Sequence, residues 1–296
     1  MSVVECVPNF SEGRDAVVIR SIRDAVAVVP GILVLGCESD EDHNRTVITM
    51  VGPPEAVAAA ALAGAVQAAA SIDLREHSGV HPRIGAADVI PFIPVSADAT
   101  MDECVRLART TAEALWLEAA VPSFLYEFAA TRPDHRNLED VRRGGFEGLR
   151  ARTFDVGGPL PNPSAGASAI GARRFLIACN VNLDTYDLSI AKRIAKKIRA
   201  SSGGFPYVKA LGLELAHRGQ AQVSLNLTHH EVTSLDTVFL AIRDEVAREG
   251  AAIAETELIG FIPRAAAVRG QQFLSQCPGF TSSRILENRI AEVAGA

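Results

Sequence analysis

The sequence contains no pair of cysteines with the spacing of a metal or dithiol site. Its 296 residues include five cysteines that lie far apart along the chain: Cys6, Cys37, Cys104, Cys179 and Cys277. Because no two of them form a C-x-x-C motif, the pattern argues against a thiolate metal site and against a dithiol redox centre. Scattered single cysteines are typical of proteins in a reducing cytosol, where they act as small buried hydrophobic residues.

The sequence also lacks an excess of basic residues and a long apolar run. Lysine and arginine number 29 against 35 aspartates and glutamates, and the resulting net charge of −6 disfavours nucleic-acid binding. Residues 1–5 include no basic region, and no long apolar stretch follows them. The most apolar segment, 56–66, is mostly alanine and too short to cross a bilayer. We therefore expect a soluble cytoplasmic protein with neither a nucleic-acid nor a membrane partner.

Several common catalytic motifs are missing as well. The sequence contains no G-x-x-x-x-G-K-[ST], no G-x-G-x-x-G after a predicted strand and no G-x-S-x-G. A phosphate-binding loop, a dinucleotide fold and a serine hydrolase therefore have no support from motifs.

Hydrophobic periodicity predicts the order β-α-β-β-α-β in each half of the chain. In the first half we expect strands at 2–7, 32–37, 46–51 and 89–95, and helices at 14–29 and 55–70, followed by a helix at 101–118 and a strand at 123–126. In the second half we expect strands at 175–181, 208–215, 222–227 and 257–262, and helices at 187–199 and 234–248. Two prolines interrupt the strand at 89–95, which favours an edge position.

This repeated order predicts an α/β (α+β) protein of two ferredoxin-like subdomains, at 1–172 and 173–296, each with helices on one face of a mixed sheet. The connection between the two repeated halves falls in segment 155–166, which is too rich in glycine and proline for a helix or strand. Its composition fits a linker and equally a ligand-binding loop, since glycines let a backbone approach a ligand closely.

The densest polar cluster is segment 73–88, which holds two histidines, two arginines and three carboxylates between a predicted helix and strand. Histidine is the natural proton-transfer residue near neutral pH. His77 and His81 have the i, i+4 spacing of a helical metal pair, but Ser78-Gly79 and Pro82 argue against a helix, so we expect no metal there. Composition alone favours the simpler interpretation, that both are surface or hydrogen-bonded histidines of a loop.

The motifs of this chain resemble one known family, that of glutamate formimidoyltransferase (formiminotransferase). The resemblance extends from about residue 3 to about residue 265. It is carried by ordered blocks at 4–13, 42–47, 51–55, 77–95, 171–178, 180–183, 208–212, 221–227 and 257–263. The blocks include the sequences VECVPNFSEG, DHNRTV and HSGVHPRIGAADVIPFIPV.

The resemblance implies a fold, an assembly and a reaction. Two subdomains would face each other with their sheets across a ligand tunnel, in a homodimer. The enzyme would be a transferase of histidine degradation and one-carbon metabolism. It would move the formimino group of N-formimino-L-glutamate to N5 of tetrahydrofolate, a co-substrate, without a metal. The cyclodeaminase domain fused to some members would be absent.

The resemblance also places functional residues. Its catalytic histidine falls on His81, which would act as general acid and base. Glu38 stands where members carry an aspartate, whose side chain is one methylene shorter, and it would be the second catalytic residue. The folate-contacting loop falls on 157–166, with Gly157, Gly158, Pro159, Ser164 and Gly166 as its binding residues.

Three further residues are candidates for substrate binding. Arg45 and Arg83 suit the carboxylates of glutamate because a guanidinium pairs with a carboxylate through two parallel hydrogen bonds. Asn9 lies in a strand-end segment that could face a ligand.

Two other functions stay open at this point. A related transferase would use N-formyl-L-glutamate and give 5-formyltetrahydrofolate, and a paralogue would bind folate without catalysis. One departure bears on the donor: His229-His230 stands where members have an aspartate followed by an aromatic residue.

Overall fold

The computed structural model describes residues 2–41, 43–79, 82–215 and 218–295. The chain divides into two compact units, Met1–Arg173 and Arg174–Ala296. The boundary proposed from the sequence, between residues 172 and 173, differs from this one by one residue. The predicted class, a mixed α and β protein with two sheets, is confirmed. The ferredoxin-like form of both units and the facing of their sheets stay predictions.

Unit 1 is built on a seven-stranded sheet. Its strands are β1 (Val4–Cys6), β2 (Asn9–Phe10), β3 (Leu33–Asp40), β4 (Arg45–Gly52), β5 (Ala87–Pro94), β6 (Ser123–Glu127) and β7 (Ser168–Ala172). Its helices are α1 (Ala16–Ala27), α2 (Pro54–Ser71), α3 (Met101–Ala119) and α4 (Leu138–Val141), with 3-10 turns η1 (Pro133–His135) and η2 (Phe146–Ala151). β4 pairs with β3 on one side and with β1 and β2 on the other. β1 and β2 in turn pair antiparallel with β5, and β5, β7 and β6 are parallel to one another.

Unit 2 is built on a four-stranded antiparallel sheet in the order β11-β8-β10-β9. Its strands are β8 (Ile177–Leu183), β9 (Val208–Leu215), β10 (Gln220–Leu227) and β11 (Ile253–Ile259). Its helices are α5 (Leu188–Ile198), α6 (Leu235–Arg248), α7 (Arg264–Val268), α8 (Gln271–Leu274) and α9 (Leu286–Ala294), with η3 (Ala200–Ser202) and η4 (Ser282–Arg284). The predicted pairing of 208–215 with 222–227 is confirmed, because β9 and β10 pair antiparallel.

Side chains just before four of the helices set where they begin. Asp15 caps α1, Thr100 caps α3, Asp187 caps α5 and Ser234 caps α6, each by accepting a backbone N–H of the first turn. Such a cap satisfies a donor that has no partner within the helix.

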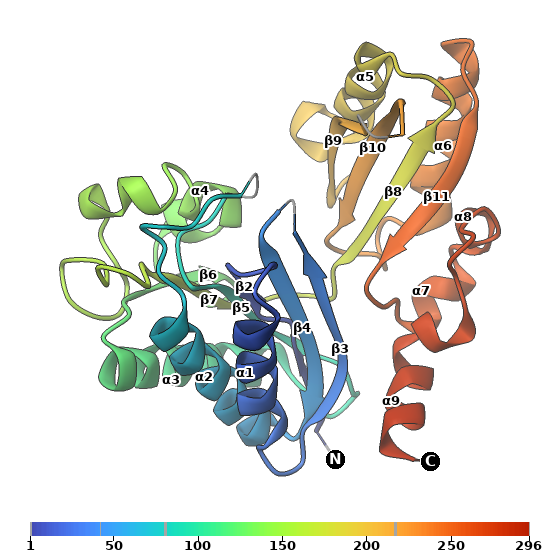
Figure 1. Cartoon of the computed structure of the whole chain (residues 1–296). Coiled ribbons are helices and arrows are strands. Elements are labelled where there is room, and N and C mark those ends of the chain that lie inside the picture. The colour runs from blue at the N-terminus through green and yellow to red at the C-terminus, as the bar shows by residue number, and fades with distance from the viewer. Residues whose placement is uncertain (1, 42, 80–81, 216–217, 296) are drawn as a thin grey trace. The chain divides into compact units, whose positions relative to one another are not determined.

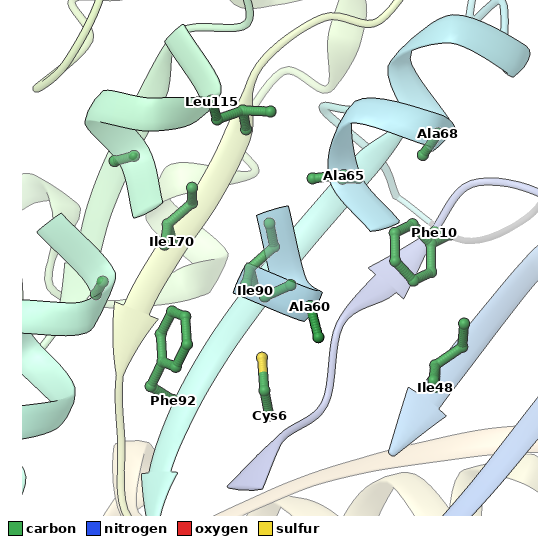
Figure 2. Close-up of a cluster of buried hydrophobic side chains, with 14 of the residues drawn as sticks. Cys6, Phe10, Ile48, Ala60, Ala65, Ala68, Ile90, Phe92, Leu115 and Ile170 are labelled. Carbon is green, nitrogen blue, oxygen red and sulfur yellow. The ribbon is translucent and has the colours of Figure 1, made fainter. Parts of the chain in front are cut away.

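One apolar core joins helices α1, α2 and α3 to one face of the unit 1 sheet (Figure 1). Figure 2 shows the sheet residues Cys6, Phe10, Ile48 and Ile90 beside the alanines of α2. Alanines dominate the buried face of α2, so this helix lies close to the sheet. A smaller cluster, which includes Ile84, Phe124 and Leu149, packs under the segment that holds α4 and η2.

The expected edge position of the strand at 89–95 is wrong, because β5 lies inside the sheet between β1/β2 and β7. β1 pairs with residues 92–94 and β2 with residues 87 and 89, so the ladder is already interrupted opposite Pro91. A proline at this point therefore costs no hydrogen bond to that neighbour.

Glu5 on β1 is a carboxyl group buried in the sheet, 2% exposed. Burial raises the pKa of Glu5 from 4.5 to about 7, against the opposing effect of the Arg173 guanidinium. The folded chain therefore binds this proton more tightly than the unfolded chain does. The resulting stability is fully present below pH 4.5 and is lost as the pH rises through 7.

The Glu5→Gln variant tests this pH dependence. We expect its unfolding free energy, relative to that of the parent chain, to be about 2 kcal/mol higher (more stable) at pH 8 than at pH 5. Denaturant unfolding of both proteins at the two pH values measures this difference. A difference that is equal at pH 5 and pH 8 would show that Glu5 titrates normally.

Candidate active site

A narrow hollow in unit 1 gathers polar side chains from three connections of the fold. It is lined by Ser11, His43, Asn44, Arg45, His77, Arg83 and Asp88. These residues come from the β2–α1 connection, from the β3–β4 turn with the start of β4, and from the α2–β5 connection with the start of β5. The space does not admit a water-sized sphere, so a ligand group that bound here would displace side chains.

Asn44 holds these three connections together. Its Oδ1 accepts the Gly13 N–H at 2.8 Å, and its Nδ2 donates to the Ser78 carbonyl at 3.0 Å. Asn44 has a φ of 49°, a left-handed conformation that asparagine adopts more readily than most residues. A Cβ added at Gly79 would lie 2.6 Å from the His43 carbonyl oxygen, so the loop rests directly on the turn.

Asp88 anchors the base of the hollow and is 2% exposed. Its Oδ1 accepts the Ile84 N–H at 2.7 Å, and its Oδ2 accepts two hydrogen bonds from the Arg142 guanidinium. Burial, followed by repulsion from Arg142, lowers the pKa of Arg45, and Asp88 and Asp40 oppose this. Arg45 is nevertheless charged at neutral pH, since an arginine does not lose its proton in a protein. The hollow therefore holds a partly desolvated cation.

Arg83 is held by one carboxylate and one carbonyl. Its guanidinium donates to Glu147 Oε1 at 3.1 Å and to the His77 carbonyl at 3.3 Å. Its Nε is buried and has no hydrogen-bond partner within the described residues. Buried donors are usually paired, so this N–H is available to a ligand acceptor.

The glycine-rich segment lies against the polar segment at 73–88. Gly166 forms a bridge with Gly85, the Ala86 N–H donates to the Ala165 carbonyl at 2.9 Å, and the Leu74 N–H donates to the Ser164 carbonyl at 2.9 Å. Two regions that the sequence singled out for different reasons are therefore neighbours in unit 1. A linker between units would not need this pairing.

Gly157 and Gly158 are required by packing. Gly157 has a φ of 107°, and a Cβ there would lie 2.9 Å from both Pro122 and the Trp116 ring. A Cβ at Gly158 would lie 2.9 Å from the same ring. Their lack of a side chain is thus explained by Trp116 and Pro122. Pro159, which follows them, is exposed.

Gly166 provides a test of the paired loop. A Cβ there would lie 2.2 Å from the Ile84 carbonyl oxygen, and its φ of 72° disfavours other residues. We expect Gly166→Ala to lower the unfolding free energy by at least about 2 kcal/mol. Gly279→Ala is the control, because a Cβ at Gly279 meets nothing within 4 Å. Equal denaturant midpoints for the two variants would contradict this account of the loop.

The structure does not gather all the candidate residues in the hollow. Glu38 on β3 and Asn9 on β2 both pair in register with Val47 of β4, so their side chains lie on one face of the sheet with Val47 between them. Neither lines the hollow. Glu38 is exposed, and Asn9 Nδ2 donates to the Val7 carbonyl at 3.0 Å. His81 lies outside the described residues.

One buried hydrogen-bonded pair and one buried ion pair were not predicted from the sequence. His135 Nδ1 lies 2.6 Å from Asp155 Oδ2, and Arg142 pairs with Asp88. Asp155 also accepts the Leu125 N–H at 2.8 Å and a hydrogen bond from Thr131, so it ties the start of the glycine-rich segment to strand β6. The partners are 20 and 54 residues apart, and no local pattern marks such pairs.

The described residues contain neither a candidate metal-binding cluster nor a candidate membrane-spanning helix. No group of three His, Cys, Asp or Glu side chains in the described ranges is placed to hold a metal ion. Within the same ranges, no helix has both the length and the apolar character needed to span a bilayer.

The sequence matches known protein domains and proteins along nearly its whole length. Residues 3–173 match the N-terminal subdomain of the formiminotransferase domain, and residues 178–289 match the formiminotransferase domain. The chain is 42% identical to the glutamate formimidoyltransferase of Thermoplasma acidophilum, over 99% of both chains. It is 41% identical to that of Streptococcus pyogenes serotype M1, over 97% of this chain and 98% of the relative.

A longer relative matches as well. The formimidoyltransferase-cyclodeaminase of Rattus norvegicus is 40% identical over 88% of this chain, and the match covers 50% of that protein. The matches to both domain models and to full-length relatives agree with one another. The chain belongs to the formiminotransferase family.

Proposed function

We propose that this protein is a glutamate formimidoyltransferase. It transfers the formimino group of N-formimino-L-glutamate to N5 of tetrahydrofolate and releases glutamate, as a step of histidine degradation that feeds one-carbon metabolism. The observation that carries the proposal is the 42% identity, over 99% of both chains, to a relative named for this activity. The alternative donor, N-formyl-L-glutamate, has no comparable support.

The reaction needs one group that can both take up and give back a proton. N5 attacks the formimino carbon, a new C–N bond forms, and the bond from that carbon to the glutamate nitrogen breaks. In our proposal His81 accepts the proton from N5 and then donates it to the departing nitrogen, a role that suits a side chain titrating near neutral pH. Glu38 would orient that imidazole.

The hollow beside β4 suits the carboxylates of the donor. Arg45 is partly desolvated there, and the buried Nε–H of Arg83 has no partner among the residues that the structure describes. A cation that has already lost water binds a carboxylate more strongly than an exposed one does. We propose that Arg45 and Arg83 bind the glutamate carboxylates and that Asn9, on the sheet nearby, contacts the same substrate.

Tetrahydrofolate is the second substrate, and we assign its contacts to the glycine-rich loop. The binding residues would be Gly157, Gly158, Pro159, Ser164 and Gly166. The pairing of this loop with residues 84–86 supports the proposal, since it fixes the loop beside the segment that holds His81. We further propose a homodimer that acts in the cytoplasm without a metal cofactor.

Loss of the Arg83 charge should weaken donor binding more than it slows the chemical step. We expect Arg83→Met to raise KM for N-formimino-L-glutamate about 10- to 100-fold, with a smaller effect on kcat and on KM for tetrahydrofolate. Arg106→Met is the matched control. Arg106 also pairs with a single glutamate, at 2.8 Å, but on the exposed surface of α3. An unchanged KM in Arg83→Met would remove this residue from the site.

A steady-state assay tests the function itself. Purified protein receives tetrahydrofolate with either N-formimino-L-glutamate or N-formyl-L-glutamate, and glutamate release is followed in each case. We expect turnover with the formimino donor at a kcat/KM well above that for the formyl donor. Preference for the formyl donor, or folate binding without turnover of either donor, would overturn the proposal.

A further inference from the structure

We propose that His77 determines donor specificity, because its Nδ1 accepts a hydrogen bond from the terminal N–H of the formimino group. A formyl group has an oxygen at that position and no hydrogen to donate. The inference deepens the proposed function and rests on it. It assigns the choice between the two donors to one atom of a residue that lines the hollow.

A hydrogen bond to the backbone fixes which nitrogen of His77 carries the proton. His77 Nε2 lies 3.1 Å from the carbonyl oxygen of Asn44. A carbonyl oxygen only accepts hydrogen bonds, so Nε2 must donate. In the neutral imidazole Nδ1 then carries a lone pair and no hydrogen. His77 therefore offers an acceptor at Nδ1.

That acceptor is unused within the described part of the chain. Nδ1 of His77 is buried and has no hydrogen-bond partner within the described residues. Buried polar atoms are nearly always paired, and an unpaired one in a polar hollow suggests that a ligand completes it. The donor Nε–H of Arg83, which lines the same hollow, is unused in the same way. One unpaired acceptor and one unpaired donor match a substrate that carries both an N–H group and a carboxylate.

Hydrogen bonds to the carbonyl groups of residues 77 and 78 fix the backbone that carries the imidazole. The His77 carbonyl accepts a hydrogen bond from Arg83 at 3.3 Å, and the next carbonyl, that of Ser78, accepts one from Asn44 Nδ2 at 3.0 Å. Asn44 itself is buried and is bonded to Gly13. A fixed acceptor discriminates well, since it cannot turn to offer a hydrogen to a carbonyl oxygen.

The chemistry of the two donors gives the direction of the preference. The terminal nitrogen of the formimino group carries hydrogen and meets the Nδ1 lone pair favourably. The formyl oxygen would bring a second lone pair against Nδ1, and both would stay unpaired. A site built around one hydrogen bond rejects an analogue that lacks the matching group far more strongly than an apolar pocket does.

Two variants of His77 separate the acceptor from the loop contact. In His77→Gln the side-chain amide reaches the place of Nε2 and keeps the bond to Asn44, but no acceptor stands at Nδ1. In His77→Asn the shorter side chain places its oxygen near Nδ1 but does not reach Asn44. The readout is the ratio of kcat/KM for the formimino donor to kcat/KM for the formyl donor, together with the inhibition constant of the formyl compound.

We expect His77→Gln to lower this ratio about 10- to 100-fold, while His77→Asn keeps most of it at a reduced overall rate. A ratio unchanged in His77→Gln, or equal losses with both donors in both variants, would overturn the assignment. His229→Gln is the comparison in unit 2, because His229 Nδ1 is also buried without a partner in the described ranges. If the ratio changes there and not at His77, the assignment also fails. A parent protein that turns over neither donor would instead refute the proposed function.

Discussion

His81→Ala lowers kcat with the formimino donor by about 10²- to 10⁴-fold, the usual contribution of a general acid–base residue. Without the imidazole, no group in the proposed mechanism carries the proton from N5 to the glutamate nitrogen. KM for both substrates should change little, because His81 binds neither of them through a charge. Rapid-quench and steady-state measurements with tetrahydrofolate give both quantities.

The fold should be unaffected by this substitution, since the sequence predicts His81 in a polar loop and a residue of that kind contributes little to a core. Thermal unfolding of His81→Ala within 1–2 °C of the parent, about the shift expected for a small loss of stability, would establish this. Added imidazole should restore part of the rate, because it supplies the missing base. A kcat close to that of the parent would remove His81 from the mechanism.

Asp88→Ala lowers the unfolding free energy by about 3–5 kcal/mol, the cost of removing one partner of a buried ion pair. The side chain of Asp88 is 3% exposed and that of Arg142 is 16% exposed, so the arginine would keep a buried charge without its carboxylate. The Ile84 N–H would also lose its acceptor. Chemical denaturation of the two proteins gives this difference directly.

Two further variants identify the source of the Asp88 effect. Asp88→Asn keeps an acceptor for Ile84 but loses the charge and the acceptor for the Arg142 guanidinium, so it should fall between the parent and Asp88→Ala. Asp73→Ala removes a carboxylate that pairs with Arg75 on the surface, and its denaturant midpoint should hardly move. Equal midpoints for Asp88→Ala and Asp73→Ala would show that the buried pair stabilises nothing.

Most elements with a strong hydrophobic period were predictable. The prediction of a strand at 208–215 coincides with β9, and the helix expected at 101–118 ends one residue short of α3. Strand β7 was missed because its sequence, Ser168-Ala-Ile-Gly-Ala172, has a single β-branched residue. Its glycine is required by the neighbouring strand, since a Cβ at Gly171 would lie 2.4 Å from the Tyr126 carbonyl oxygen.

The candidate site was predictable in its parts but not in its assembly. The sequence singled out the segments that contain Ser11, Arg45 and His77, because polar residues cluster after predicted strands and helices. It did not show that Asn44 joins these segments, because the bonds to Gly13 and Ser78 span 31 and 34 residues. Nor did it give the tautomer of the neutral His77 imidazole, which depends on the carbonyl oxygen of Asn44.

Transfer of a one-carbon group from glutamate to folate can be followed atom by atom. NMR would follow N-formimino-L-glutamate labelled with ¹³C in the formimino carbon during turnover with tetrahydrofolate. We expect the label to appear on N5 of the folate, one equivalent for each glutamate released. Label that stays on glutamate, or that leaves as a free one-carbon product, would contradict this transfer.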